Sequence, residues 1–186
     1  MLNELLRKRT IAAAVLMFSV PFLLLASVYD ALPAELSVLR NPLSGAVTIA
    51  PKSAFMVFRV PLMNLSHGLM AAVMLSHAND FQNAERRASF AAVFTTLLFA
   101  IALKSNFEAL EISGLTGLMG PLAGAFTVGT VLSVTGGLGL ALARSRRVPL
   151  PWSELRMPTL DKVTLAGLFV GYLAIVTASM LISRRV

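Results

Sequence analysis

The sequence contains no cysteine among its 186 residues, and only 13% of them are charged. The missing thiols exclude a disulfide framework, a cysteine nucleophile, an iron–sulfur cluster and any zinc site that uses cysteine. Soluble domains carry about 25% charged residues, so a chain with 56% hydrophobic residues and so few charges is not an ordinary soluble domain. The mean hydropathy of +0.77 further excludes a disordered chain, a coiled coil and a soluble nucleic-acid-binding domain.

Long apolar runs are the main feature of the sequence. A helix needs about 20 predominantly apolar residues to cross the ~30 Å hydrocarbon layer of a bilayer. Runs of this kind predict an all-α fold, a polytopic integral membrane bundle of about five transmembrane helices, with four or six as alternatives. The predicted helices cover residues 11–28, 54–76, 88–103, 118–143 and 163–182, with continuation of the third helix toward Glu108 as an alternative. They form one membrane domain, 1–186, with an outer loop at 29–53 and an inner connector at 144–162.

Basic residues predict the orientation of the chain, because short cytoplasmic loops carry an excess of lysine and arginine. With the N-terminus inside, ten of the sixteen basic residues lie on the inner side and five on the outer side, with Arg59 in a helix. Five helices then place Arg184 and Arg185 outside, against this trend. The cluster Arg7-Lys8-Arg9 also resembles the start of a signal peptide, but we expect the first run to be retained as a signal anchor or first transmembrane helix. The alanine- and arginine-rich composition suggests a bacterial cytoplasmic (inner) membrane protein.

The second predicted helix carries an unusual line of side chains at helical spacing. Its members lie within about an 80° arc of the helix: Met56, Arg59, Met63, His67, Met70, Met74 and His77. Thioether and imidazole ligands suit Cu(I), so Met63, His67, Met70 and Met74 form a candidate metal site. Ionisable residues inside a membrane often mark function, so Arg59, Asn64 and His67 form a candidate polar site. The alternative is simple packing, since methionine fills irregular gaps between helices.

Small residues mark the faces on which membrane helices approach one another closely. The last predicted helix has an even stripe of them at spacings of three and four: Thr164, Gly167, Gly171, Ala174 and Ala178. The glycine-rich fourth helix contributes Gly120 and Gly124, and its further glycines predict a central place in the bundle. Either these stripes only pack within the chain, or an outward-facing stripe docks a partner or a second copy.

Catalytic groups are poorly represented. The sequence has no Gly-x-Ser-x-Gly elbow, no HExxH motif and no phosphate-binding glycine loop. We expect the nine carboxylates to lie in loops, in the N-terminal tail or at helix ends, with Glu108 and Glu111 beside Lys104 at a solvated end of the third helix. We expect no carboxylate in the middle of a transmembrane helix, and this argues against proton-coupled transport by a carboxylate relay. The sequence therefore predicts no catalytic residue, no enzymatic activity and no cofactor.

Residues 11–76 resemble the amino-terminal domain of unknown function of the SdpI-like immunity family. The resemblance rests on Leu32-Pro33, Asn41, Gly45 and Lys52-Ser53, which opens an apolar helix. Arg40 stands where that family has a histidine, and no acidic residue follows the glycine at once, so no functional residue is carried over. The resemblance implies a bacterial multi-pass membrane protein, sometimes acting in toxin immunity or signalling with a membrane-bound partner.

Two functions fit this sequence. The first is a non-enzymatic bundle that acts in the lipid bilayer through helix–helix binding to a membrane-protein partner or as a homo-oligomer, as an immunity-type, sensory or accessory subunit. The second is transport or handling of a small solute or copper on the Met/His/Arg face of the second helix. Small-residue stripes and the lack of catalytic groups favour the first.

Overall fold

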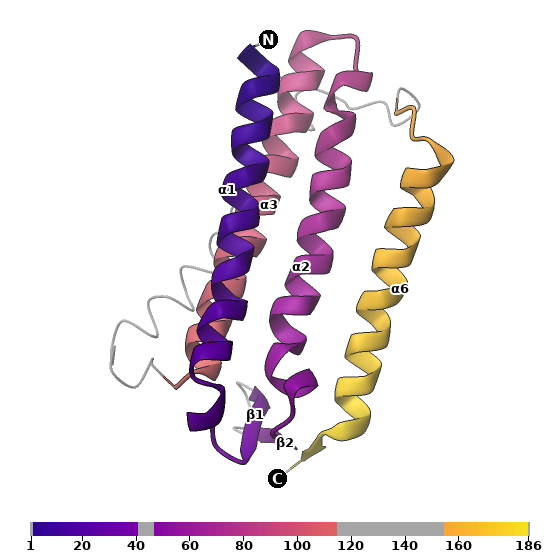
Figure 1. The fold of residues 1–186 in the computed structure, drawn as a ribbon. Helices are drawn as coiled ribbons and strands as arrows, with labels where there is room; N and C mark the ends of the chain where they lie inside the picture. Colours follow the sequence, from indigo (N-terminus) through magenta and orange to yellow (C-terminus); the bar gives the residue numbers. More distant parts are fainter. Residues whose placement is uncertain (1, 41–46, 115–154, 186) are drawn as a thin grey trace.

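Four long helices stand side by side in the computed structural model, which describes residues 2–40, 47–114 and 155–185 (Figure 1). They are α1 (Leu2–Ser27), α2 (Ala54–Ser76), α3 (Ala84–Ile112) and α6 (Thr159–Ile182). Each is long and apolar enough to cross a membrane. The mostly helical fold that the sequence predicts is therefore confirmed. The predicted helix at 118–143, with Gly120 and Gly124, lies outside the described residues, so the count of about five stays a prediction.

Within the described bundle, α2 contacts each of the three other helices (Figure 1). Its bounds agree with the predicted helix at 54–76 because Ser53 caps it, with Oγ accepting a hydrogen bond from the Met56 backbone N–H at 3.2 Å. Capping also explains why α3 begins earlier than predicted. The Asn83 side chain accepts hydrogen bonds from the backbone N–H groups of Glu85 and Arg86, at 2.8 and 3.2 Å.

The predicted bounds of the other helices are too narrow. Helix α1 starts at Leu2, so the basic cluster lies within its first turns instead of ahead of it. Helix α6 starts at Thr159, four residues before the predicted Val163. Helix α3 continues to Ile112 instead of stopping at 103, a difference of nine residues that equals the difference at the start of α1.

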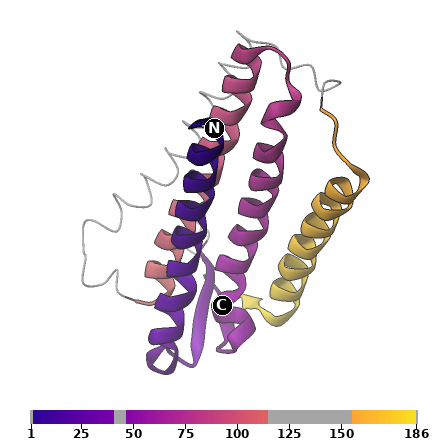
Figure 2. The same ribbon diagram turned by 45° about the horizontal axis from the view of Figure 1, so that its top comes forward.

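A small sheet lies at one end of the bundle, and its first two strands fall in residues 29–53, which the sequence predicts to be an outer loop. β1 (Glu35–Arg40) and β2 (Val47–Pro51) pair in antiparallel fashion, and β3 (Arg184–Arg185) pairs with the other edge of β2. The chain thus returns after α6 to the strands that follow α1, and the C-terminus lies at the opposite end from the N-terminus (Figure 2). The short helix η1 (Tyr29–Ala31) and Lys52, whose Nζ donates to the Leu32 carbonyl at 2.8 Å, tie α1 to this sheet.

The other end of the bundle carries the turn between α2 and α3, which forms the short helix η2 (His77–Asp80), and the start of α6 (Figure 1). Phe81 and Phe90 pack there with ring centroids 4.8 Å apart, and Phe94 continues the stack at 4.6 Å. Both Phe81 and Phe90 are fully buried. Helix α3 ends beside the sheet, whereas α6 begins beside η2.

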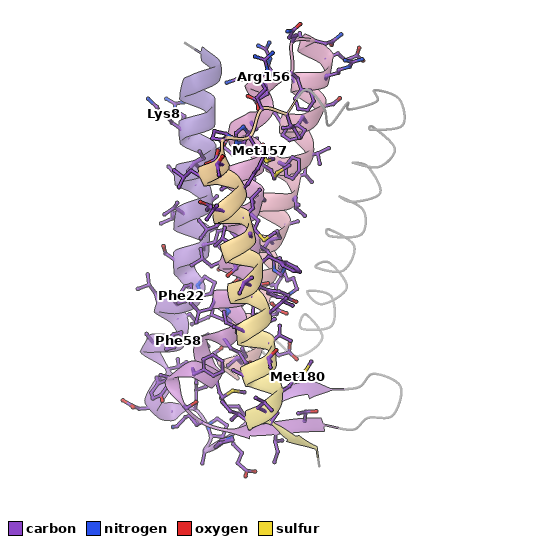
Figure 3. All side chains as sticks on the ribbon, turned by 90° about the vertical axis from the view of Figure 1, so that its right-hand side faces the viewer. Lys8, Phe22, Phe58, Arg156, Met157 and Met180 are labelled. Carbon is purple, nitrogen blue, oxygen red and sulfur yellow. The ribbon has the colours of Figure 1, made fainter. Side chains whose placement is uncertain are left out.

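Helices α1 and α2 are in tight contact where Phe18 lies over Gly68. A Cβ atom placed on Gly68 would lie 2.6 Å from Phe18 Cε2, which is closer than real atoms approach. Further along the same pair of helices, Phe22 stacks on Phe58 with ring centroids 6.1 Å apart (Figure 3). The absence of a side chain at position 68 therefore sets the spacing of these two helices.

Candidate functional site

Two polar side chains of α2 are buried inside the bundle. Arg59 is 3% exposed and Asn64 is 4% exposed. The Arg59 guanidinium donates a hydrogen bond from Nη1 to the Met56 carbonyl of its own helix. Both residues belong to the predicted polar site, and their burial within an apolar helix is the feature that singles them out.

Helix α3 supplies the partners of Asn64. Lys104 Nζ lies 2.6 Å from Glu108 Oε1 and donates to the side-chain oxygen Oδ1 of Asn64 at 3.2 Å. The Asn64 amide nitrogen in turn donates to Glu108 Oε2 at 2.7 Å. Asn64 therefore closes a ring of hydrogen bonds with an ion pair one turn apart on the neighbouring helix. We call Arg59, Asn64, Lys104 and Glu108 the polar cluster.

This arrangement corrects the expectation that Lys104, Glu108 and Glu111 form a solvated helix end. Glu108 contacts Asn64, the eleventh residue of α2, so it lies at the level of the helix interior. Its carboxylate also attracts the buried Arg59 guanidinium. The physical reason is charge compensation: Lys104 and Asn64 satisfy the carboxylate, which lets α3 continue past both charges. Glu111 is exposed, as the expectation requires.

The polar cluster carries one carboxylate and two cations. Asn106, close by on α3, adds a contact to the third helix by donating to the Met17 carbonyl of α1 at 3.0 Å. In a medium of low dielectric constant, such charges interact far more strongly than in water. The cluster therefore fixes the relative positions of α2 and α3, and Asn106 links α3 to α1.

His67 does not join the polar cluster by a hydrogen bond that the structure shows. The centroid of its ring lies 4.4 Å from the centroid of the Tyr172 ring, so His67 contacts α6. Met63, Met70 and Met74 are half-buried on the same side of α2. Within the described ranges, no group of three or more histidine, aspartate or glutamate side chains could hold a metal ion. The copper hypothesis, which relies on thioethers, stays a prediction.

His77, the last residue of the methionine and histidine line, joins α6 to the α2–α3 turn. Its Nδ1 lies 3.0 Å from Asp80 Oδ2, and its Nε2 lies 2.7 Å from Asp161 Oδ2. The same Asp80 oxygen accepts a hydrogen bond from the Arg156 backbone N–H at 3.0 Å. The imidazole is buried and holds the start of α6 against η2, so its role here is structural.

The small-residue stripe of α6 faces away from α2. Only 6% of the most apolar stretch of α6 is buried, against 39% for α2 and for α3. Gly167, Gly171 and Ala174 are exposed, and Ala178 is half-buried. No described atom lies within 4 Å of a Cβ built on Gly167 or Gly171. The stripe is therefore open within the described part of the chain.

Sequence reasoning missed Lys104 and Glu108 as hydrogen-bond partners of the buried Asn64. Their spacing of four residues places opposite charges side by side on one helix face, but this spacing also occurs on solvated helix faces. The apolar residues after Lys104, such as Phe107, Ala109 and Ile112, also continue the helical pattern beyond 103. Comparison with protein-family models, with curated proteins and with solved structures gave no match to this chain.

Proposed function

We propose that this chain is a multi-pass protein of a bacterial cytoplasmic membrane that acts without catalysis, by binding a membrane-protein partner or a second copy through α6. The excess of lysine and arginine on one side supports an N-terminus inside the cell, at the end of the bundle that carries η2 and the start of α6. The sheet and the end of α6 then lie outside.

The open glycine face of α6 is the observation that carries the proposal. Lipid gives helices no hydrophobic gain from association, so close backbone approach along glycine and alanine is what favours helix pairing. Helix α6 uses its other side to contact α2 and Tyr172 to contact His67. Within the described residues, the space next to Gly167 and Gly171 that a second helix would approach is open.

Replacing Gly171 with leucine is expected to abolish co-purification of the partner or second copy after mild detergent extraction, because the added side chain keeps the helices apart. Ala166→Leu is the matched control: it adds comparable bulk at an exposed position of α6 that lies off the stripe. The chain has no cysteine, so a single Gly171→Cys substitution adds a crosslinking test without background. The proposal would be contradicted if Gly171→Cys formed no intermolecular disulfide and Gly171→Leu also gave a lower yield of monomer. The loss of co-purification would then come from misfolding and not from a blocked helix face.

A second candidate, transport of a small solute or copper, is favoured by the ionisable residues buried in the bundle. It predicts that Met63→Leu and His67→Leu each abolish copper tolerance or uptake. The first substitution removes a thioether ligand and the second an imidazole ligand, and each puts an apolar leucine in its place. If the protein acts by partner binding, these two substitutions are nearly silent in the same growth and uptake assays. Gly171→Leu then has the opposite pattern, with assembly lost and copper handling unchanged.

A further inference from the structure

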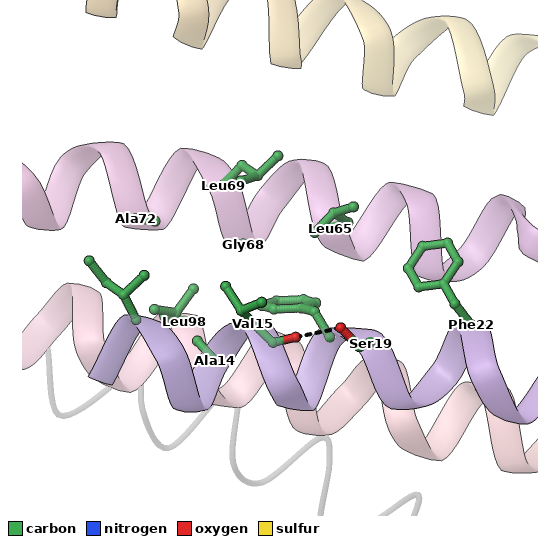
Figure 4. Close-up of a pocket in the computed structure, with 11 residues that line it drawn as sticks. Ala14, Val15, Ser19, Phe22, Leu65, Gly68, Leu69, Ala72 and Leu98 are labelled. Atoms are coloured by element: carbon green, nitrogen blue, oxygen red, sulfur yellow. Dashed lines mark hydrogen bonds between the residues drawn. The ribbon is translucent and has the colours of Figure 1, made fainter. Parts of the chain in front are cut away.

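An apolar groove runs between α1 and α2 on the side of α2 that faces away from α6 (Figure 4). It has a cavity volume of about 260 Å³ and is open on one side. Helix α1 lines it from Ile11 to Phe22, and α2 lines it from Leu65 to Ala72. Phe18 over Gly68 forms its floor, because the ring fills the space that a side chain at position 68 would take.

The length of the groove matches one leaflet of a bilayer. Eleven residues of α-helix separate Ile11 from Phe22, which corresponds to about 16 Å. Half of a ~30 Å hydrocarbon layer is about 15 Å, the depth that one lipid acyl chain occupies. The rim is also apolar, since Val15 and Leu69 are 60% and 45% exposed. A single acyl chain fits the dimensions and the chemistry of this groove.

Positive charge lies at one end of the groove and identifies the head group. Lys8 is three residues before Ile11, so the two side chains share one face of α1, and Lys8 is exposed. Lys8 lies near the N-terminal end of α1, far along the helix from Phe22 (Figure 3). Arg9 is also exposed, but helical spacing places it on the other face of α1, away from the groove.

We propose that the groove between α1 and α2 binds one anionic phospholipid, with an acyl chain along the groove and the phosphate beside Lys8. This inference rests on the proposed insertion of the chain in a membrane. With the N-terminus inside, the site faces the leaflet in which anionic head groups attract basic residues. The proposal adds a lipid site to the protein and is independent of the partner face on α6.

The test is native mass spectrometry of the full chain, released from vesicles that contain phosphatidylcholine and phosphatidylglycerol. Wild type is expected to retain one phosphatidylglycerol in preference to phosphatidylcholine. Each basic residue near an anionic surface contributes about a factor of five in affinity, so Lys8→Gln is expected to lose roughly five-fold. The matched control, Arg9→Gln, removes an exposed charge at the same depth but on the other face of α1, and should retain the lipid.

A groove-filling variant tests the acyl-chain part of the site. Ala72→Leu is expected to reduce retention of the lipid, whereas Ala26→Leu, at an exposed position of α1 off the groove, is expected to leave it unchanged. Equal retention of both phospholipids by wild type, or equal loss in the two charge variants, would overturn the lipid site alone. Release of the chain from membranes by an alkaline carbonate wash would instead overturn the membrane proposal, and this inference with it.

Discussion

Glu108→Ala is expected to lower the free energy of unfolding by about 2–4 kcal/mol. Removing one partner of a buried ion pair leaves an uncompensated charge, which typically costs about 3–5 kcal/mol. The expected value here is somewhat lower because about a third of the Glu108 and Lys104 side chains is exposed. Glu108 also accepts a hydrogen bond from the Asn64 amide, so its loss leaves the Lys104 ammonium and the Asn64 amide without their common partner.

Thermal unfolding in a fixed detergent measures this effect. The matched control is Glu111→Ala, one turn further along α3 at an exposed position, where the change is expected to stay within about 0.5 kcal/mol. A double variant, Lys104→Met with Glu108→Leu, is expected to recover part of the loss, because neither charge of the pair then remains. Equal effects of the Glu108 and Glu111 substitutions would show that the polar cluster does not stabilise the bundle.

Gly68→Ala is expected to destabilise the protein by about 1–3 kcal/mol, although alanine favours helices over glycine. The added methyl group would overlap the Phe18 ring, and overpacking of a tight contact costs this much. The matched control is Gly167→Ala, on an open helix face, where the helical preference alone acts and predicts a gain of about 0.5–1 kcal/mol. Two identical substitutions in two helices of the same chain therefore have opposite signs.

A double variant separates the clash from other effects of the Gly68 substitution. Phe18→Leu shortens the side chain that faces position 68, so its combination with Gly68→Ala is expected to be more stable than the sum of the single changes predicts. Unfolding midpoints in the same detergent measure this coupling for all four chains. Strict additivity, or a Gly68→Ala variant as stable as wild type, would contradict the close contact between α1 and α2.

The sequence predicted α2 well because its two determinants are local. Ser53 supplies a cap, and the apolar run that follows has the length of a membrane span. The end of α3 was predicted wrongly because Lys104 and Glu108 are charged. In the sequence alone, charged residues after an apolar run predict that the helix ends in solvent. The partner that allows them inside the bundle is Asn64, forty residues earlier in the chain. Tertiary pairing of this kind leaves no mark in composition or hydropathy.

The polar cluster and the small-residue stripe of α6 also show how far the sequence alone can predict a site. Burial of Arg59 and Asn64 followed from their place in an apolar helix, whereas Lys104 and Glu108 required the neighbouring helix to be known. Spacing alone identified the stripe that includes Gly167 and Gly171. It could not say whether the stripe faces α2 or faces outward, because both arrangements use the same sequence pattern.

The pairing of β2 with β3 has a consequence for synthesis of the protein. Strand β2 ends at Pro51 and its second partner begins at Arg184, so 132 residues lie between them. At roughly 5–20 residues per second, a ribosome needs on the order of ten seconds to add that length. During this interval the edge of β2 that later pairs with β3 lacks that partner and can pair with another chain. The newly made protein therefore passes through a stage in which this edge of β2 is open to chaperones and to neighbouring copies.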